Sequence, residues 1–383
     1  MAQRHVDVLL IGGGVAAVRC ARTLRRRAFD GSIVLVGEEA VLPYNRPPLS
    51  KELLRGEVPL ELIAAESESW YERQRVEVLL SMPVVSLDAE ARLAVLADGS
   101  SISFDRCLLA TGAAPRRPPI PGAEHALLLR TLDDALAIRE RAVPGGRAVV
   151  VGGGFIGVEV AASLASAGVR VTVVELEPSL WGRSLGEELS AWAAEVLRSA
   201  GVSLRLGSAV SRVEASAVFI GQERLAADLV IAGVGVTPRV ELAAGLTLDD
   251  GIVTDARRRT SAAGIFAAGD VARVDGLRVE HWHAAREGGE AAALAMLELP
   301  APPRRAPWVF SEFADASLEV VGNAPEPDEI RRIGSAPDRF ALAYLRDGVV
   351  AQLAIVNGAI PVEAARTFVE QGSALDKLNI GPD

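Results

Sequence analysis

The stretch Val149-Val150-Val151-Gly152-Gly153-Gly154-Phe155-Ile156-Gly157 decides the fold of this chain. A β-branched run leads into three glycines, and a helix-like stretch follows them. In such a unit the first glycine allows a tight turn, the next ones let the backbone approach a pyrophosphate, and the last lets the helix pack close to the sheet. The pattern predicts a strand–turn–helix unit that binds a dinucleotide at the helix N-terminus. The residues expected to form this site are Gly152, Gly154, Phe155, Ile156 and Gly157.

The residues after this turn support the same interpretation. Ile156, Val160 and Leu164 recur every four positions, as the buried face of a helix requires. The next apolar strand, 169–174, ends at Glu175. A carboxylate at that position binds the adenosine ribose hydroxyls and repels a 2′-phosphate, so we expect NADH rather than NADPH. The nearby Arg183 would soften that preference.

A second glycine-rich turn lies about 140 residues earlier. The apolar run 8–11 leads into Gly12-Gly13-Gly14, and Ala17 takes the place of the third glycine. The following strand, 32–37, leads to Glu38, again at the ribose position. Two dinucleotides in one chain predict hydride transfer from a nicotinamide to a flavin. The residues expected to hold this first dinucleotide include Gly12, Gly14, Val15, Ala16 and Glu38.

Two further apolar strands that end in glycine, 108–112 and 229–235, indicate a diverged internal duplication. The Pro-rich segment 114–122 leads out of the first copy, and the segment 260–270 leads back into it. The chain is therefore predicted to be α/β, with one Rossmann-like domain inserted into another. After the proline cluster 300–307, alternating residues predict a small antiparallel sheet with a helix near 362–372, making an α+β C-terminal domain. The expected boundaries are 1–113 with 241–302 for the first domain, 114–240 for the second, and 303–383 for the third.

Composition excludes several classes of function. The net charge of the 383 residues is −10, which argues against binding to nucleic acid or to anionic membranes, and no apolar run approaches the length of a membrane span. The only cysteines, Cys20 and Cys107, rule out a disulfide framework and favour the cytoplasm. The four histidines form no metal-binding pattern, so no metal is expected. We expect a monomer or a homodimer.

Three further segments carry a resemblance to a known family. They are Pro43-Tyr44-Asn45-Arg46-Pro47-Pro48-Leu49-Ser50-Lys51, Leu129-Arg130-Thr131-Leu132-Asp133-Asp134-Ala135 and Ala268-Gly269-Asp270. With both turns, they make the chain resemble the FAD-dependent, NADH-utilising ferredoxin reductases of aromatic-ring dioxygenase and cytochrome P450 systems. The resemblance runs nearly end to end and implies a glutathione-reductase-like arrangement of the two Rossmann-like domains. It implies FAD and NAD as cofactors.

The resemblance also implies a role for individual residues. Lys51 would lie by the flavin ring, where a cation stabilises the negative charge of the reduced ring. Trp282 would lie against the isoalloxazine and Glu159 close to the nicotinamide, and with Lys51 these are the expected catalytic residues. Asp270 would bind the ribityl hydroxyls, Arg130 the pyrophosphate region and Val84 the adenine end. Further cofactor contacts are expected at Arg46, Ala110, Thr111, Gly112 and Gly235.

Less specific interpretations of these residues remain open at this point. Lys51 could be a surface lysine at a helix end, Glu159 a solvated helix carboxylate, and Trp282 a core residue. The chain also departs from the family pattern. It has Asn45 in the first segment, His283 after Trp282, and Trp308-Val309-Phe310-Ser311-Glu312-Phe313 where the family has two tryptophans followed by Ser-Asp-Gln. We expect these departures to lie in the parts that meet the partner or substrate.

The expected electron acceptor is a [2Fe–2S] ferredoxin or a rubredoxin. The arginine runs 304–305, 331–332 and 257–259 are either a docking patch for an acidic ferredoxin or ordinary solvated faces. A disulfide or peroxide reductase is disfavoured because segment 38–51 has no cysteine. Reduction of a quinone or small organic acceptor, and a redox-regulated binding role, are the remaining alternatives.

Overall fold

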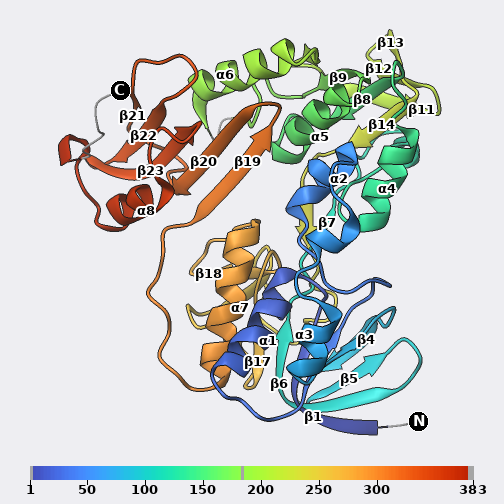
Figure 1. Ribbon diagram of the computed structural model, residues 1–383, viewed down its shortest axis with the longest axis vertical. Coiled ribbons are helices and arrows are strands. Elements are labelled where there is room, and N and C mark those ends of the chain that lie inside the picture. Colours follow the sequence, from blue (N-terminus) through green and yellow to red (C-terminus); the bar gives the residue numbers. More distant parts are fainter. Residues whose placement is uncertain (1–2, 183–184, 378–383) are drawn as a thin grey trace. The chain divides into compact units, whose positions relative to one another are not determined.

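The computed structural model describes residues 3–182 and 185–377. The chain divides into two compact units. The first unit contains residues 1–45, 60–114 and 237–304, and the second contains 46–59, 115–236 and 305–383. The chain passes from one unit to the other after residues 45, 59 and 304, and also within β7 (Ala113–Pro115) and β15 (Val236–Pro238), two short strands that pair with each other. Strand β7 is labelled in Figure 1.

The first unit is built on a seven-stranded sheet. Six strands follow the order β3-β2-β1-β6-β5-β4, and the seventh, β17, pairs with β6. The long strand β6 pairs with β5 near its start and with β17 near its end. A strand from much later in the sequence therefore completes the sheet. Helices α1 and α7 pack against each other on this sheet (Figure 1). The elements of the sheet and its helices are β1 (Gln3–Ile11), α1 (Val15–Arg26), β2 (Ile33–Val36), α3 (Glu68–Arg73), β3 (Val76–Leu79), β4 (Val84–Asp88), β5 (Leu93–Leu96), β6 (Ser101–Leu109), β17 (Ile265–Ala267) and α7 (Trp282–Met296). The smaller elements are η2 (Leu60–Ile63) and the paired strands β16 (Ile252–Thr254) and β18 (Ala272–Val274).

The second unit contains two larger sheets. One is a parallel sheet with the order β10-β9-β8-β14, next to a three-stranded antiparallel sheet, β11-β12-β13. The other is an antiparallel sheet with the order β19-β20-β23-β22-β21. The elements of residues 46–232 are η1 (Pro47–Ser50), α2 (Glu52–Arg55), η3 (Ala123–His125), α4 (Leu132–Arg141), β8 (Arg147–Val151), α5 (Phe155–Ser166), β9 (Arg170–Val174), α6 (Gly186–Ser199), β10 (Ser203–Arg205), β11 (Val210–Glu214), β12 (Ala217–Ile220), β13 (Glu223–Ala226) and β14 (Leu229–Ala232). Those of residues 308–377 are β19 (Trp308–Phe313), β20 (Ala316–Gly322), β21 (Glu329–Ile333), β22 (Ala341–Arg346), β23 (Val349–Val356), α8 (Val362–Glu370) and η4 (Leu375–Lys377).

The α/β fold class expected from the sequence is confirmed, since each unit has parallel strands that lead through a glycine turn into a helix. The division into three functional domains stays a prediction. The two compact units group residues 46–59 and 305–383 with 115–236. This grouping reflects packing, because α2 contacts both α4 and α5, and β19 contacts α5.

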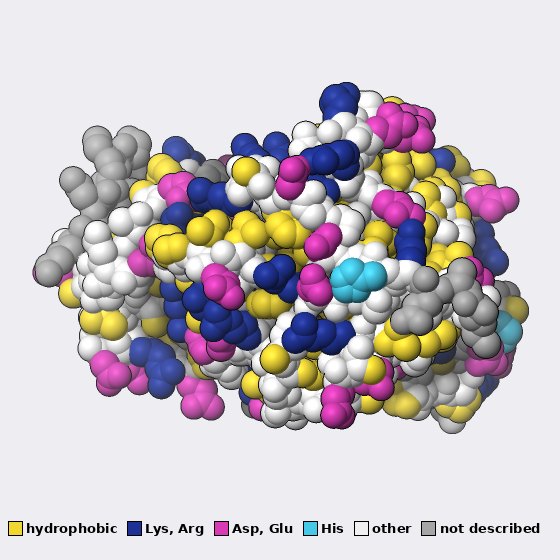
Figure 2. Space-filling model, turned by 90° about the horizontal axis from the view of Figure 1, so that it is seen from below, with side chains coloured by type: hydrophobic (Ala, Val, Ile, Leu, Met, Phe, Trp, Pro, Cys, Tyr) yellow, Lys and Arg dark blue, Asp and Glu magenta, His cyan; other side chains and the backbone are white. Residues whose placement is uncertain are grey.

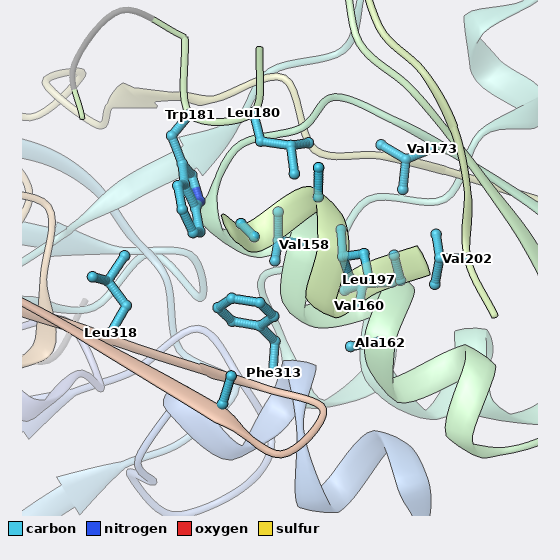
Figure 3. Close-up of a cluster of buried hydrophobic side chains, with 14 of the residues drawn as sticks. Val158, Val160, Ala162, Val173, Leu180, Trp181, Leu197, Val202, Phe313 and Leu318 are labelled. Atoms are coloured by element: carbon cyan, nitrogen blue, oxygen red, sulfur yellow. The ribbon is translucent and has the colours of Figure 1, made fainter. Parts of the chain in front are cut away.

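Phe313 corrects one expectation from the sequence. It was expected in a part that meets the partner or substrate, but only 2% of its surface is exposed. Its ring centroid lies 5.9 Å from that of Trp181 and 5.6 Å from that of Trp192. Figure 3 shows its ring beside Val158 of α5 and below Trp181. The side chain of Phe313 therefore points into the hydrophobic core, where an aromatic ring is favoured.

The two cysteines lie in the core of the first unit. Both are free and fully buried, and burial raises the pKa of each thiol well above its ordinary value. They therefore behave as small apolar side chains. Within residues 3–182 and 185–377, no helix is both long and apolar enough to cross a bilayer. The same residues contain no group of three His, Cys, Asp or Glu side chains that could hold a metal ion.

Candidate functional site

The glycine turn of the second unit has the geometry that a dinucleotide requires. Gly152 follows β8 with φ = +108°, and a Cβ atom there would lie 2.4 Å from the carbonyl oxygen of Gly233. A Cβ at Gly157 would lie 2.0 Å from the carbonyl oxygen of Gly152. By contrast, a Cβ at Gly154 would meet no atom within 4 Å. Gly152 thus lets the turn pack against Gly233, and Gly157 lets α5 pack against the turn. Gly154 instead borders open space at the N-terminus of α5.

That open space is part of a pocket of about 400 Å³. Glu175 lies at its edge, where one carboxylate oxygen accepts a hydrogen bond from the Gly153 amide and the other accepts one from the Glu177 amide at 2.8 Å. The pocket therefore joins a phosphate-sized cradle to a fixed carboxylate, which fits the pyrophosphate and ribose of NAD. Arg183 lies outside the described residues. The lining residues are Val151, Gly152, Gly154, Phe155, Val174, Glu175, Leu176, Trp181, Gly182, Ser208, Val210, Gly233, Val234 and Gly235.

The first unit repeats this geometry at the carboxyl end of its own sheet. Gly12 has φ = +120°, and a Cβ atom there would lie 2.2 Å from the carbonyl oxygen of Ala110. Gly14 and Val15 begin α1. A Cβ at Gly289 of α7 would lie 2.1 Å from the carbonyl oxygen of Ala16, so the two helices pack at backbone distance. The turn therefore has the close packing that the FAD site requires, with Ala17 in place of the third glycine.

Parallel strands bring several expected FAD residues to one edge of this sheet. Gly12, Glu38, Ala110 and Asp270 follow β1, β2, β6 and β17, which pair in parallel register. Ligands of open α/β sheets bind at this edge. Thr111 and Gly112 continue from Ala110, whereas Val84 begins β4.

Arg239 is a neighbour of this edge that sequence reasoning missed. Its Nη1 donates to Glu38 Oε2 at 2.7 Å, and its backbone carbonyl accepts a hydrogen bond from Thr111 Oγ1 at 2.7 Å. The hydrogen bond to Glu38, with the charges of nearby carboxylates, raises the pKa of the guanidinium. The arginine therefore positions the carboxylate that was predicted to bind ribose.

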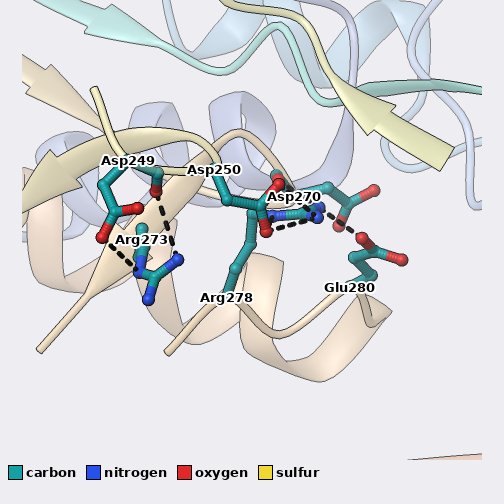
Figure 4. Close-up of polar contacts among 6 residues, drawn as sticks. All are labelled: Asp249, Asp250, Asp270, Arg273, Arg278 and Glu280. Atoms are coloured by element: carbon teal, nitrogen blue, oxygen red, sulfur yellow. Dashed lines mark hydrogen bonds and ion pairs between the residues drawn. The ribbon is translucent and has the colours of Figure 1, made fainter. Parts of the chain in front are cut away.

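The backbone of Asp270 is contacted by the side chain of Arg278. Only 9% of the Arg278 side chain is exposed, and its guanidinium bonds both oxygens of Asp250 at 3.1 and 3.3 Å. It also pairs with Glu280 and donates to the carbonyl oxygen of Asp270 at 3.5 Å (Figure 4). One buried cation thereby ties the predicted ribityl-binding loop to the segment that leads into Trp282.

Trp282 is the first residue of α7, and its indole Nε1 donates to Asn45 Oδ1 at 2.9 Å. The Arg286 guanidinium lies 5.3 Å from the indole ring centroid, and the ring of His283 packs edge-on against the indole at 4.8 Å. His283 also stacks on His281, which caps the helix. Asn45 and His283, both departures from the family pattern, therefore contact or surround the predicted flavin-stacking residue.

Lys51 and Glu159 form a buried ion pair in the second unit. Lys51 Nζ lies 3.0 Å from Glu159 Oε2, and these residues are 5% and 4% exposed. The burial contradicts the alternatives of a surface lysine and a solvated carboxylate. Two hydroxyls complete the cluster, because Ser50 Oγ donates to Glu159 Oε2 at 2.5 Å and Ser311 Oγ donates to Glu159 Oε1 at 2.7 Å. The Phe310 ring centroid lies 5.6 Å from Lys51 Nζ. Buried charges of this kind persist only when they are paired and hydrogen-bonded.

The remaining predicted residues lie in the second unit as well. Arg46 precedes η1, and Arg130 lies one residue before the N-cap of α4, where its amide donates to Asp134 at 2.9 Å. Phe155 and Ile156 open α5, and the Ile156 side chain is 45% exposed. The structure thus places Gly12, Gly14, Glu38, Asp270 and Trp282 in one unit. It places Arg46, Lys51, Arg130, Glu159 and Glu175 in the other.

The arginine runs considered as a docking patch have partners within their own units. Arg304 pairs with Asp275, Arg331 with Glu329, and Arg332 with Glu188. Arg305 bridges Glu363 and Glu370, both at 2.8 Å, and Arg258 is half-buried. On the face shown in Figure 2, Lys and Arg side chains alternate with Asp and Glu instead of forming a patch of one sign. These ion pairs agree with the interpretation of the arginine runs as ordinary solvated faces rather than as a docking patch.

Comparison with known proteins agrees with this geometry. Residues 6–289 match the pyridine nucleotide-disulphide oxidoreductase family. Putidaredoxin reductase of Pseudomonas putida is 33% identical over 98% of this chain and 93% of its own length. The ferredoxin–NAD(+) reductase component of the p-cumate 2,3-dioxygenase system of Pseudomonas putida is 35% identical over 96% of this chain and 94% of its own length.

Solved structures show the same relationship. The reductase in the crystal structure of the covalent putidaredoxin reductase–putidaredoxin complex superposes with a TM-score of 0.90, at 34% identity, over 96% of this chain and 92% of that one. The ferredoxin reductase for the CYP199A2 system from Rhodopseudomonas palustris gives a TM-score of 0.88, at 33% identity, over 97% and 98% of the two chains. The chain therefore belongs to the pyridine nucleotide-disulphide oxidoreductase family and, within it, to the FAD-dependent NADH–ferredoxin reductases, as its resemblance predicted.

Proposed function

We propose that this enzyme takes hydride from NADH onto FAD and passes single electrons to a [2Fe–2S] ferredoxin that supplies an oxygenase. One observation carries the proposal. The chain has two dinucleotide turns, and segment 38–51 between them has no cysteine to receive electrons from a flavin. The flavin is then the last electron carrier within this protein, and a separate protein accepts its electrons. Relatives named as ferredoxin–NAD(+) reductase components, matched over nearly their full lengths, support that partner.

The cofactor supplies the redox chemistry, because bound FAD can take up two electrons from NADH and release them one at a time. The protein's contribution is to bind and orient the two dinucleotides. Gly152, Gly154 and Gly157 shape the pyrophosphate cradle, and Glu175 binds the adenosine ribose and disfavours a 2′-phosphate. Gly12, Gly14 and Asp270 would hold FAD, with Glu38 fixed by Arg239.

We assign the charged pair to the redox centre. Lys51 would provide the cation that stabilises negative charge on the reduced ring. Glu159 would hold that buried ammonium in place through the ion pair and would meet the nicotinamide. Trp282, oriented by its hydrogen bond to Asn45, would pack against the isoalloxazine. Arg46 and Arg130 would bind the FAD phosphates and Val84 its adenine end.

The expected domains follow from these roles. Residues 1–113 with 241–302 would bind FAD, residues 114–240 would bind NADH, and 303–383 would form the third domain. The buried reduced thiols fit a cytoplasmic protein. A monomer or homodimer is expected, and the size-exclusion mass of the flavoprotein measures which.

Anaerobic stopped-flow mixing tests the proposal. NADH should bleach the flavin rapidly, and a [2Fe–2S] ferredoxin added second should reoxidise it in one-electron steps. Bleaching by NADH with reoxidation by a quinone but not by ferredoxin or rubredoxin would instead establish a quinone reductase. A reduced flavin–NAD complex that persists with every acceptor would favour a redox-regulated binding protein. Failure of NADH to bleach the flavin would contradict the enzyme as proposed.

A further inference from the structure

We propose that Ser311 is a positioning residue that fixes the Lys51–Glu159 pair, so that the C-terminal sheet tunes the flavin. The inference rests on the proposed function, in which Lys51 stabilises the reduced flavin. Ser311 lies on β19, and its side chain is completely buried.

The Glu159 carboxylate is held through both of its oxygens. Oε1 accepts a hydrogen bond from Ser311 Oγ at 2.7 Å, while Oε2 accepts one from Ser50 Oγ at 2.5 Å and lies 3.0 Å from Lys51 Nζ. A carboxylate held at one oxygen only can rotate about its terminal torsion, which has broad minima. The Ser311 hydroxyl therefore fixes the plane of the carboxylate and, through Oε2, the position of the Lys51 ammonium.

Strand β19 contacts both members of the pair. Ser311 reaches the Glu159 carboxylate, while the preceding Phe310 presents its ring to Lys51 Nζ, with a centroid distance of 5.6 Å. The cation–ring contact and the hydroxyl thus restrain the ammonium and the carboxylate from one strand. Because Phe310 and Ser311 are consecutive residues of β19, the position of this strand affects both contacts.

The residues that contact Glu159 come from distant parts of the sequence, which supports a positioning role for Ser311 rather than local packing. Ser311 is 152 residues away from Glu159 in sequence, and Ser50 is 109 residues away. Ser163 Oγ, one turn beyond Glu159 on α5, donates to the carbonyl oxygen of Ser50 at 2.7 Å and holds that segment. Three separate parts of the chain therefore meet at a single carboxylate. A serine that served only as a small core residue could equally be alanine.

The test measures the two-electron midpoint potential of the bound flavin by equilibration with a redox dye, in five variants of the FAD-loaded protein, one of which is the conservative Ser311→Cys. Ser311→Ala removes the hydroxyl, Lys51→Met removes the charge through which it acts, and the third variant combines both. Ser317→Ala on the adjacent strand β20, which pairs with β19 opposite Glu312, is the matched control. FAD content and the unfolding temperature are recorded for each variant.

The proposal predicts that Ser311→Ala makes flavin reduction about tenfold less favourable, which lowers the potential by about 30 mV for a two-electron couple. Ser317→Ala should leave the potential unchanged. Lys51→Met should lower it further, and adding Ser311→Ala to Lys51→Met should have no additional effect. Ser311→Cys, which keeps the size and a weak donor, should restore part of the lost potential.

Two results would overturn the inference. One is a Ser311→Ala protein with the potential of the parent. The other is an undiminished effect of Ser311→Ala in the Lys51→Met background, which would show that the serine does not act through the pair. A Lys51→Met protein with an unaltered potential would contradict the role of Lys51 in the proposed function itself. The potentials therefore distinguish failure of the inference from failure of the proposed function.

Discussion

The indole Nε1 of Trp282 donates a 2.9 Å hydrogen bond to Oδ1 of Asn45, although the two residues are 237 positions apart. The same amide donates through Nδ2 to the carbonyl oxygens of Ile63 and Ala64, at 3.3 and 3.5 Å. A carboxylate could accept from the indole but could not donate to these carbonyls. The unusual asparagine in the first family segment therefore links the end of η2 and Ala64 to the first turn of α7.

Replacing Asn45 by aspartate should cost about 1–2 kcal/mol of unfolding free energy, because two carbonyl oxygens lose their amide donor. Trp282→Phe, which removes the indole N–H together with part of the ring that packs against His283, should cost about 2 kcal/mol. Denaturant unfolding of the FAD-loaded proteins checks both values. Equal stability of Asn45→Asp and the parent would show that the amide contributes nothing to this contact.

Glu175→Ser should shift the cofactor preference toward NADPH. The carboxylate is fixed by two backbone amides at the pocket edge, so its removal relieves the repulsion of a 2′-phosphate. We expect the ratio of kcat/KM for NADH to that for NADPH to fall about tenfold, which corresponds to one charge–charge contact of about 1.4 kcal/mol. Glu177→Ser, an exposed neighbour with the same change in charge, should leave the ratio unchanged. Equal ratios in both variants would remove Glu175 from the specificity site.

The two glycines at the start of α5 should respond differently to alanine. Gly157→Ala places a methyl group against the Gly152 carbonyl and should destabilise the protein by about 1–3 kcal/mol. Gly154→Ala meets open space in an ordinary backbone conformation, so the protein should keep its stability while its affinity for NAD+ falls. Thermal unfolding and calorimetric titration with NAD+ separate the two effects. Unchanged NAD+ affinity in Gly154→Ala would place the pyrophosphate elsewhere.

Glu319 should make the protein less stable as the pH rises. Burial, and secondly the Glu312 carboxylate, raise the pKa of Glu319 above its ordinary value. The folded state therefore retains this proton at pH values where the unfolded chain releases it. Stability is lost as the pH rises from the unfolded pKa through the folded one. Glu319→Gln should consequently raise the unfolding temperature at pH 7 more than at pH 4.

Glu329 provides the opposite case on the same sheet. Its hydrogen bond to Arg331 lowers the pKa of the carboxyl, so its contribution is present above the unfolded pKa and is lost as the pH falls through the folded one. Glu329→Gln should therefore lower the unfolding temperature slightly at pH 7 and leave it unaltered in acid. A pH profile of the same sign for both variants would contradict the assignment of the two environments.

The glycine turns were predictable because their requirements are local. A positive φ at Gly12 or Gly152 and a close backbone approach both follow from a few consecutive residues. The antiparallel sheet after the proline cluster and the helix at Val362–Glu370 also followed from short-range patterns. Periodicity identifies the elements in this way without identifying which distant residues contact each other.

The contacts within the site could not be predicted for that reason. The resemblance implied separate roles for Lys51 and Glu159, but their ion pair and the hydroxyls of Ser50 and Ser311 join segments far apart in sequence. Arg239 carried no motif, and only folding brings it to Glu38. The expectation for Phe313 was wrong because a departure from the family pattern does not by itself indicate which face of β19 is buried.

The late arrival of β17 has a consequence for synthesis of the protein on the ribosome. Strand β6 is complete at Leu109, but the strand that pairs with its last three residues ends at Ala267, after the whole of 115–236 has been translated. At about 5–20 residues per second, the nascent sheet keeps this edge unpaired for roughly ten to thirty seconds. Helix α7, which packs on α1, follows later still. The inserted segment can therefore fold before the sheet that precedes it is finished, and we expect stable capture of FAD to await translation of β17 and α7.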